Sequence, residues 1–266
     1  MKNISQEELN KILKEHEMWL KNEEGGKCAD LRDTDLRGVD LSNIDLSGAD
    51  LKGANLSDAD LSDSILNNAN LWNTNLSYTN LRGSDLSYTN LSESDLNNAD
   101  LSNANLICIN LYSSNLKDAN LRDANLSYAD LNCANLYNAN LKYANLNDIE
   151  TNMHTVGYNI ACPEEGFFIG YKKAKGCIIK LLILEDSKRS SATTAKCRCD
   201  KAKVLDIENI KTGEKVEEVS SNYDLSFIYR VGEIVSVDDF DDNRWNECAP
   251  GIHFFMNKEN ALNYYY

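Results

Sequence analysis

The chain has 266 residues, of which 42 are acidic and 27 are basic, so its formal net charge at pH 7 is −15. No run of about 18 apolar residues occurs, which argues against a membrane-spanning helix. The acidic balance argues against direct binding to nucleic acid or to an anionic membrane. The N-terminus is polar and acidic, so we expect no signal peptide, a cytoplasmic protein and eight reduced cysteines.

Residues 1–27 are predicted to form an N-terminal capping helix. Ser5 is a good N-cap, and apolar residues beginning with Leu9 recur on one helical face, which predicts an amphipathic helix over residues 5–22. His16 lies at the edge of this face and is interpreted as a packing residue. Such a helix would cover the open end of a solenoid, and the alternative is that it binds a partner.

Leucine then occupies every fifth position from Leu31 to Leu146, which gives 24 leucines without a gap. The residue two positions earlier is Ala, Ser, Thr, Val or Ile, and the residue directly before is Asp or Asn, except at Ile65. A spacing of five fits neither the period of an α-helix nor that of a β-strand. A chain that buries every fifth residue must turn once per repeat, so the pattern predicts a solenoid of stacked units.

This run, with the consensus A(D/N)LXX, resembles the pentapeptide-repeat family over about residues 28–147. The resemblance implies a mainly β fold, a right-handed quadrilateral (four-sided) β-helix with four repeats per coil and with leucine and the small residue inside. The 24 repeats then give about 6 coils over residues 28–150, stacked at ~4.8 Å per layer into a rod of roughly 29 Å. Where Ser or Thr replaces the small residue, we expect its hydroxyl to find a backbone partner at a corner.

The five-residue pattern ends after Leu146, and residues 149–160 read as a linker. Residues 157–266 are predicted to form a separate compact, mainly β C-terminal domain. Its expected strands are FFIGYK, CIIKLLIL, CRCDKAKVLDIENI, FIYRVGEIVSV and GIHFF, with a turn at Lys175-Gly176. A short terminal helix with Asn257 as N-cap follows.

Four strings of this C-terminal segment carry a second resemblance: GYKKA, SKRSSATT, KCRCDKA and DDNRWNECAPGIHFF. They resemble a domain of unassigned activity that accompanies pentapeptide repeats in bacteriophage and bacterial proteins. The resemblance covers the whole segment and implies no mechanism.

Residues twenty positions apart should stack on one side of a four-sided coil. Beside the stack from Leu46 to Leu146, the outward positions include a candidate contact strip made of Ile65, Tyr88, Ile107, Cys108 and Tyr128. A contiguous apolar strip on a polar rod favours a contact surface. The alternative is surface variation, with tyrosines that stabilise the stacking of layers.

Residues 28–150 carry 18 acidic and 7 basic side chains, a net charge of −11. Some pentapeptide-repeat proteins resemble acidic duplex DNA and bind DNA gyrase, so the resemblance makes gyrase or another topoisomerase an alternative partner. Those proteins commonly dimerise through a C-terminal helix, and several have loops that project from the coil, whereas this coil has no insertion and a large domain follows it. The simpler interpretation is that aspartate supplies solubility and hydrogen bonds at the corners.

The C-terminal domain offers one candidate pocket, formed by Arg189, Cys248 and His253. Cys248 and His253 would pair as nucleophile and base if the intervening turn brought them together, but His253 also fits a structural histidine in an apolar strand. Cys197 and Cys199 would share one face of a strand. Neither cysteine belongs to a CxxC motif, so the sequence favours two buried free thiols over a zinc-binding site.

No Gly-rich phosphate loop or EF-hand spacing occurs, so we predict no catalytic residue, no cofactor and no metal. The predicted function is that of a non-catalytic interaction or scaffold protein, in which the coil is a spacer and the C-terminal domain docks a protein partner. A homodimer is also compatible with the sequence. The alternatives are a DNA-mimicking coil and an unrecognised enzyme in the C-terminal domain.

Overall fold

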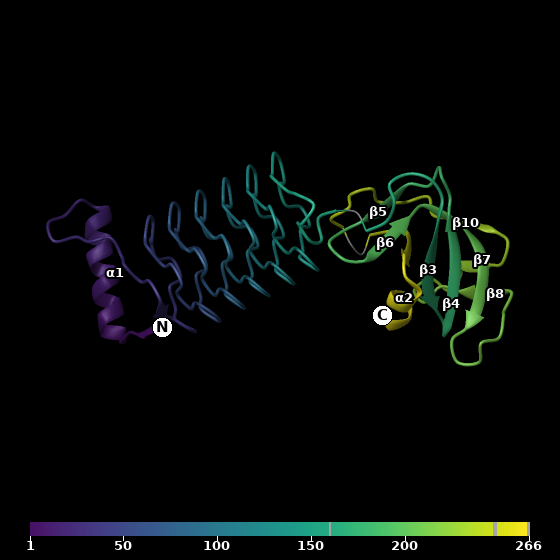
Figure 1. The fold of residues 1–266 in the computed structure, drawn as a ribbon, viewed down its shortest axis with the longest axis horizontal. Helices are drawn as coiled ribbons and strands as arrows, with labels where there is room; N and C mark the ends of the chain where they lie inside the picture. The colour runs from purple at the N-terminus through teal and green to yellow at the C-terminus, as the bar shows by residue number, and fades with distance from the viewer. Residues whose placement is uncertain (160, 247–248, 265–266) are drawn as a thin grey trace. The chain divides into compact units, whose positions relative to one another are not determined.

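The computed structural model describes residues 1–159, 161–246 and 249–264. The chain divides into two compact units, Met1–Asn159 and Ile160–Tyr266, and both are built mainly from β-structure (Figure 1). Each unit is described by itself below. Within the described residues, no helix is both long enough and apolar enough to cross a membrane.

The first unit opens with a short strand and a helix. Strand β1 (Lys2–Asn3) pairs in parallel with β2 (Thr34–Asp35), and helix α1 (Gln6–Leu20) follows β1 in the chain. The Ser5 hydroxyl caps α1 by accepting a hydrogen bond from the Glu8 N–H at 3.2 Å. The predicted helix is confirmed, whereas the sequence does not predict β1, because two residues are too few to make a pattern.

His16 connects α1 to the first repeat. Its side chain is fully buried, and its Nδ1 accepts a hydrogen bond from the Ala29 N–H at 3.1 Å. The ring also stacks on Trp19, with 5.4 Å between the ring centroids. Burial lowers the pKa of His16, and the nearby Asp45 carboxylate opposes this shift. His16 is therefore a packing residue, as the sequence predicts, and it also satisfies a backbone donor at the end of the coil.

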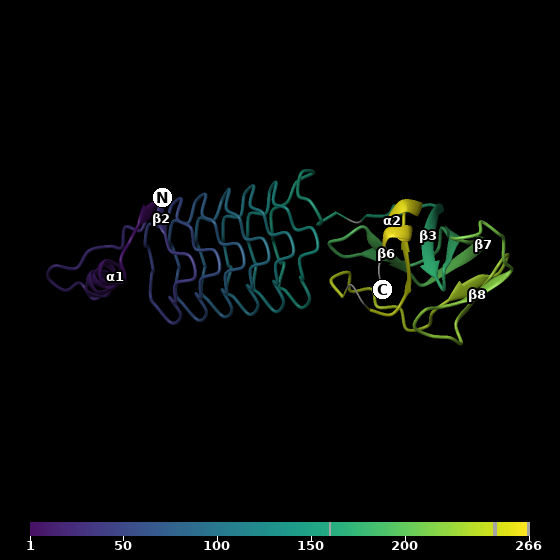
Figure 2. The ribbon, with the colours of Figure 1, turned by 90° about the horizontal axis from the view of Figure 1, so that it is seen from below.

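Residues twenty positions apart are paired throughout the repeats. Parallel bridges recur at five-residue steps, from Asp30↔Asp50 onward. From Leu31 to Leu131, each leucine N–H donates to the carbonyl nineteen residues later, as from Leu31 to Asp50 at 2.8 Å. The leucines from Leu31 to Leu141 are almost completely buried. Stacked positions are thus four repeats apart, and Figure 2 shows the successive layers along the unit.

Each repeat turns directly after its leucine. The leucine carbonyl accepts a hydrogen bond from the N–H three residues later, as from Ala49 to Leu46 at 3.0 Å. The second residue after each leucine has a positive φ, which is typical of a type II turn and favours Gly, Asn and Asp. The Asp or Asn before leucine completes the turn by accepting the N–H two residues later, as from Ser47 to Asp45 at 2.9 Å.

Hydroxyl side chains at the small inward position find backbone partners. Thr79 donates to the Leu56 carbonyl, and Ser84 donates to the Leu81 carbonyl, both at 2.7 Å. The same kind of bond to a leucine carbonyl is made by Ser64, Thr74, Thr89, Ser94 and Ser114. The prediction that backbone groups satisfy these buried hydroxyls is confirmed.

The coil continues beyond the five-residue pattern. Val156 forms a bridge with Asn135, and its carbonyl accepts the Leu136 N–H at 2.8 Å. This bridge spans one residue more than the others, so the last layer accommodates an extra residue. Thr155 is buried there, and its hydroxyl donates to the Leu131 carbonyl at 2.9 Å. Part of the segment predicted to be a linker therefore belongs to the coil.

The second unit contains a seven-stranded antiparallel sheet in the order β10-β7-β4-β3-β11-β6-β5, and a separate antiparallel hairpin of β8 and β9. The strands are β3 (Phe168–Ala174), β4 (Cys177–Ile183), β5 (Arg189–Ser191), β6 (Lys196–Cys199), β7 (Lys201–Asn209), β8 (Glu218–Ser220), β9 (Ile228–Arg230), β10 (Ile234–Ser236) and β11 (Ile252–Phe255). Helix α2 (Lys258–Asn263) follows the last strand.

Strands form within each of the five predicted segments, but two of these segments are divided. CRCDKAKVLDIENI forms β6 and β7, because at Asp200 the chain leaves its pairing with β11 and begins to pair with β4. FIYRVGEIVSV forms β9 and β10, which are separated by Gly232 with a φ of 89°. Lys175 and Gly176 both have positive φ, as a tight hairpin between β3 and β4 requires. Asn257 caps α2 as predicted.

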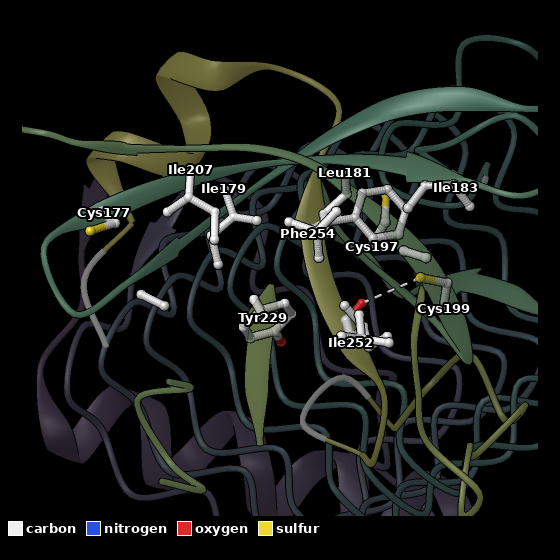
Figure 3. Close-up of a cluster of buried hydrophobic side chains, with 14 of the residues drawn as sticks. Cys177, Ile179, Leu181, Ile183, Cys197, Cys199, Ile207, Tyr229, Ile252 and Phe254 are labelled. Atoms are coloured by element: carbon white, nitrogen blue, oxygen red, sulfur yellow. Dashed lines mark hydrogen bonds between the residues drawn. The ribbon is translucent and has the colours of Figure 1, made fainter. Parts of the chain in front are cut away.

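Apolar side chains pack on both faces of this sheet. The larger cluster contains Ile179 and Phe254 of the sheet and Tyr229 of the β8–β9 hairpin (Figure 3). A smaller cluster contains Phe255 of β11 and Ala261 of α2. The hairpin therefore covers one face of the sheet, and α2 covers the other.

Buried His16 is expected to make the stability of the first unit depend on pH. Because the folded-state pKa lies below 6.5, the unfolded chain takes up a proton first as the pH falls. The free energy of unfolding should therefore decrease as the pH falls from about 7 to about 5. His16→Gln keeps an acceptor but does not titrate, so it should weaken this dependence in urea unfolding followed by circular dichroism. An equal pH dependence in both proteins would contradict the assignment.

Candidate functional site

The predicted contact strip lies on repeats that stack directly on one another. Bridges from Ile65 to Asp85, and onward at steps of twenty residues to Asn125, join its four layers. Tyr88 and Tyr128 are 61% and 60% exposed, and Ile65 is 39% exposed. Ile107 and Cys108 are half-buried. All five members of the contact strip are thus accessible on one series of layers: Ile65, Tyr88, Ile107, Cys108 and Tyr128.

Three members of the contact strip occupy the left-handed position of the turn. The φ angles of Tyr88, Cys108 and Tyr128 are 59°, 55° and 60°. A side chain other than Gly, Asn or Asp in this conformation costs about 1 kcal/mol. Three consecutive layers of the contact strip therefore carry residues that the turn itself disfavours.

Other repeats carry a tyrosine at the same turn position, but as single residues. Tyr78 has a φ of 60° and is 60% exposed, and Tyr143 has a φ of 63° and is 56% exposed. Tyr143 lies beside two cations, with the Arg122 guanidinium 5.5 Å and the Lys142 ammonium 4.9 Å from its ring centroid. Glu93, Ser113 and Cys133 also occupy this turn position on three consecutive layers, so what distinguishes the contact strip is its pair of largely exposed tyrosines, Tyr88 and Tyr128.

The acidic residues beside the contact strip take part in the turns. The Asp85 carboxylate accepts hydrogen bonds from the Ser87 N–H at 3.0 Å and from the Asn105 amide at 2.9 Å. The same twenty-residue ladder links Asn70 to Asp50 at 3.0 Å. These contacts support the interpretation that aspartate at the corners serves the architecture of the coil.

Arg189 is predicted to line the C-terminal pocket, but its side chain forms hydrogen bonds with nearby backbone carbonyls. Its guanidinium donates to five carbonyls at 2.8–3.3 Å, those of Pro163, Gly166, Leu184, Glu185 and Ser187. The guanidinium also lies over the Phe168 ring, 5.3 Å from its centroid. The described geometry therefore gives Arg189 a structural role.

His253 lies on β11 and lines a cavity of about 600 Å³, but Arg189 is not among the lining residues of that cavity. The register explains the separation, because Arg189 aligns through Cys199 with Ile252 rather than with His253. Adjacent strand residues project to opposite faces, so the prediction that Arg189 and His253 share a pocket is wrong. Cys248 lies outside the described residues.

Cys197 and Cys199 are both buried in the larger apolar cluster. Burial raises the pKa of the Cys199 thiol. The hydrogen bond between Cys162 and Cys197 lowers the pKa of Cys162 and raises that of Cys197, so Cys162 is the more acidic thiol of this pair. Among the described residues, no three potential ligands gather in a metal-binding arrangement.

Sequence reasoning did not single out Arg198, which is almost completely buried. Its guanidinium donates to the carbonyls of Asp241, Asn243 and Asn246 at 2.6–3.1 Å, which ties that loop to β6. Lys172 and Lys196 were also missed, although both are buried at the cavity that His253 lines. The sequence of β3 does contain a signal for Lys172. Side chains alternate between the two faces of this strand, and Lys172 falls on the same buried face as Gly170 and Ala174.

Comparison with known families divides the chain in the same way. The model for pentapeptide repeats (8 copies) matches six overlapping segments that together span residues 29–149. Residues 158–261 match a family of unknown function, DUF5758. A search of curated proteins finds no match.

Several solved structures are similar to this chain. The pentapeptide repeat protein Rfr23 from the cyanobacterium Cyanothece 51142 is 30% identical, and the match covers 56% of this chain and 98% of that protein, with a TM-score of 0.34. A pentapeptide repeat protein from the Arabidopsis thaliana thylakoid lumen is 32% identical over 38% of this chain and 68% of that one, with a TM-score of 0.23.

A trypsin-treated form of QnrB1, a plasmid-mediated fluoroquinolone resistance protein, is 17% identical over 47% of this chain and 83% of its own, with a TM-score of 0.27. The family assignment rests on the repeat model and on the relative that is matched over nearly its whole length. This chain belongs to the pentapeptide-repeat family, and its C-terminal segment is a DUF5758 domain.

Proposed function

We propose that this protein is a non-catalytic interaction or scaffold protein. In this proposal, the repeat coil binds a protein partner through the contact strip, and the C-terminal domain docks a partner of its own. We also propose that the coil is a right-handed, four-sided β-helix of about six turns. The pairing of residues twenty positions apart, with five residues per repeat, supports four repeats in each turn.

One observation carries the proposal for the coil: two largely exposed tyrosines, Tyr88 and Tyr128, lie in left-handed turns on the layers directly before and after that of Cys108. Both tyrosines are largely exposed, so their rings contribute little burial to the isolated coil. Tyrosine is well suited to protein interfaces, because its ring is large, rigid and apolar and ends in a polar hydroxyl. The partner surface that fits is an apolar protein surface with hydrogen-bonding groups at its edge.

Replacing residues of the contact strip (the strip variant) distinguishes a surface that binds a partner from tyrosines that only stabilise the stacking of layers. Tyr88→Asn, Ile107→Ser and Tyr128→Asn together should abolish partner capture or self-association by the full chain. Because Asn tolerates the left-handed turn better than Tyr, coil stability should rise by up to about 1 kcal/mol for each replaced tyrosine. Analytical ultracentrifugation, capture from a bacterial lysate and urea unfolding measure these effects.

The matched control is the double variant Tyr78→Asn and Tyr143→Asn, which replaces tyrosines in the same conformation outside the contact strip. It should leave capture and self-association unchanged. Unchanged capture and oligomeric state in the strip variant, or a loss of coil stability with no other effect, would support the stacking role and reject the contact surface.

DNA mimicry is a second candidate function, favoured by the net charge of −11 on residues 28–150. The structure offers another reason for much of this charge, because corner aspartates such as Asp85 accept backbone hydrogen bonds. We therefore expect no inhibition of DNA gyrase supercoiling by the full chain at micromolar concentration. Inhibition that is reduced by replacing exposed acidic residues outside the turn ladder would favour mimicry instead.

A further inference from the structure

The C-terminal unit contains a cavity of about 600 Å³ between the start of β11 and the β8–β9 hairpin. Its walls include Phe227 and Tyr229 from the hairpin region and Ile252 and Phe255 from β11. Figure 3 shows Tyr229 and Ile252 among the side chains of the larger apolar cluster. The cavity therefore has a largely aromatic and aliphatic wall that is accessible from outside.

Two lysines from the neighbours of β11 reach this cavity. Lys172 on β3 is 7% exposed, and its Nζ donates to the His253 carbonyl at 3.3 Å. Lys196 on β6 is 8% exposed, and its Nζ donates to the Tyr264 hydroxyl at 3.2 Å. Within the described part of the chain, neither ammonium forms an ion pair with a carboxylate.

Two buried like charges without an ion-paired counter-charge are energetically unfavourable in a folded domain. Burial, with repulsion from Lys196, lowers the pKa of Lys172 to about 8, while the thiolate form of Cys199 would oppose this shift. An ammonium has three donors, so each lysine can make the hydrogen bond described and still donate to a further group. An anion in the cavity would relieve the repulsion and use those donors.

The acidic residues of the cavity restrict which anion fits. Asp224 and Asp239 are both exposed. The Asp224 carboxylate accepts hydrogen bonds from the N–H and hydroxyl of Ser226, which lowers its pKa and keeps it charged. These carboxylates would repel a second anionic group near the outside, so a ligand should carry its charge at one end and be uncharged elsewhere.

We propose that this cavity binds a small organic anion whose carboxylate or phosphate contacts Lys172 and Lys196 and whose planar or apolar body lies against Phe227 and Tyr229. This site is independent of the contact strip on the coil. The two anionic groups share the same chemistry, and the choice between them is made by the probes below.

The test is isothermal titration calorimetry of the full chain with phenyl phosphate, benzoate, inorganic phosphate and uncharged benzamide. At least one of the two aromatic anions should bind at least tenfold more tightly than both inorganic phosphate and benzamide. A preference for phenyl phosphate assigns the ligand to the phosphates, and a preference for benzoate assigns it to the carboxylates. Absence of binding by both aromatic anions at millimolar concentration, or equally tight binding of inorganic phosphate or benzamide, overturns the proposal.

Lys172→Met and Lys196→Met should each weaken binding at least tenfold, whereas Lys211→Met, at an exposed position outside the cavity, should leave it unchanged. Methionine has similar length and no charge, so Lys172→Met should raise the melting temperature while binding is lost. If Lys172→Met does not fold, Lys196→Met provides the same test. Unchanged affinity in a folded variant of either lysine overturns the proposal.

The pH dependence of benzoate binding provides a second readout, because benzoate stays anionic throughout. Affinity should decrease as the pH rises through about 8, where Lys172 loses its proton. The same decrease should be absent in Lys172→Met. The other titratable groups that line the cavity or face this lysine are Lys196, Cys199, Tyr223, Asp224, Tyr229, Asp239, His253 and Tyr264. An affinity that does not change between about pH 7 and pH 9 contradicts a role for the Lys172 ammonium.

Discussion

The hydrogen bond from a leucine N–H to the carbonyl nineteen residues later, formed by every repeat leucine from Leu31 to Leu131, is the interaction on which the repeat unit depends. One such bond contributes only about 1 kcal/mol, but the repeat forms it every five residues and buries a leucine each time. The left-handed turn after leucine brings the next repeat into position for that bond. The frequent Gly, Asn and Asp residues of the coil therefore follow from turn geometry, and so does much of its acidity.

Features that repeat were predictable from the sequence, and features that occur once were not. The leucine period and the buried hydroxyls recur many times, so the pattern itself carries the information. The left-handed position also carried a signal that our predictions did not use, because all four glycines of the repeats and most of the variable Asn and Asp residues fall at the second position after leucine. By contrast, no pattern marks Val156 as a member of the last layer or Lys2 as a partner of Thr34.

The residues of the contact strip lie together as the sequence predicts, whereas Arg189 and His253 of the predicted C-terminal pocket do not, and the reason is related. Counting by twenty places Tyr88, Cys108 and Tyr128 together without knowledge of any other contact, because the coil has a fixed repeat. The predicted pocket that Arg189 would share with His253 depended on the register of three strands. A shift of one residue in that register exchanges the faces of a sheet. Only the structure shows that Arg189 aligns with Ile252.

The arginines and lysines at inward positions of the C-terminal unit make two kinds of contact. The Arg189 and Arg198 guanidiniums donate to backbone carbonyls and hold loops, which suits a planar group with five donors. Lys172 and Lys196 each make one described hydrogen bond and border a cavity instead. An apolar residue at Lys172 would suit the inward row of β3 better, since its neighbours there are Gly170 and Ala174. Within the fold, the Lys172 ammonium contacts only the His253 carbonyl and, at 5.8 Å from its centroid, the Tyr229 ring among the interactions described, so the proposed anion site gives this charge a further role.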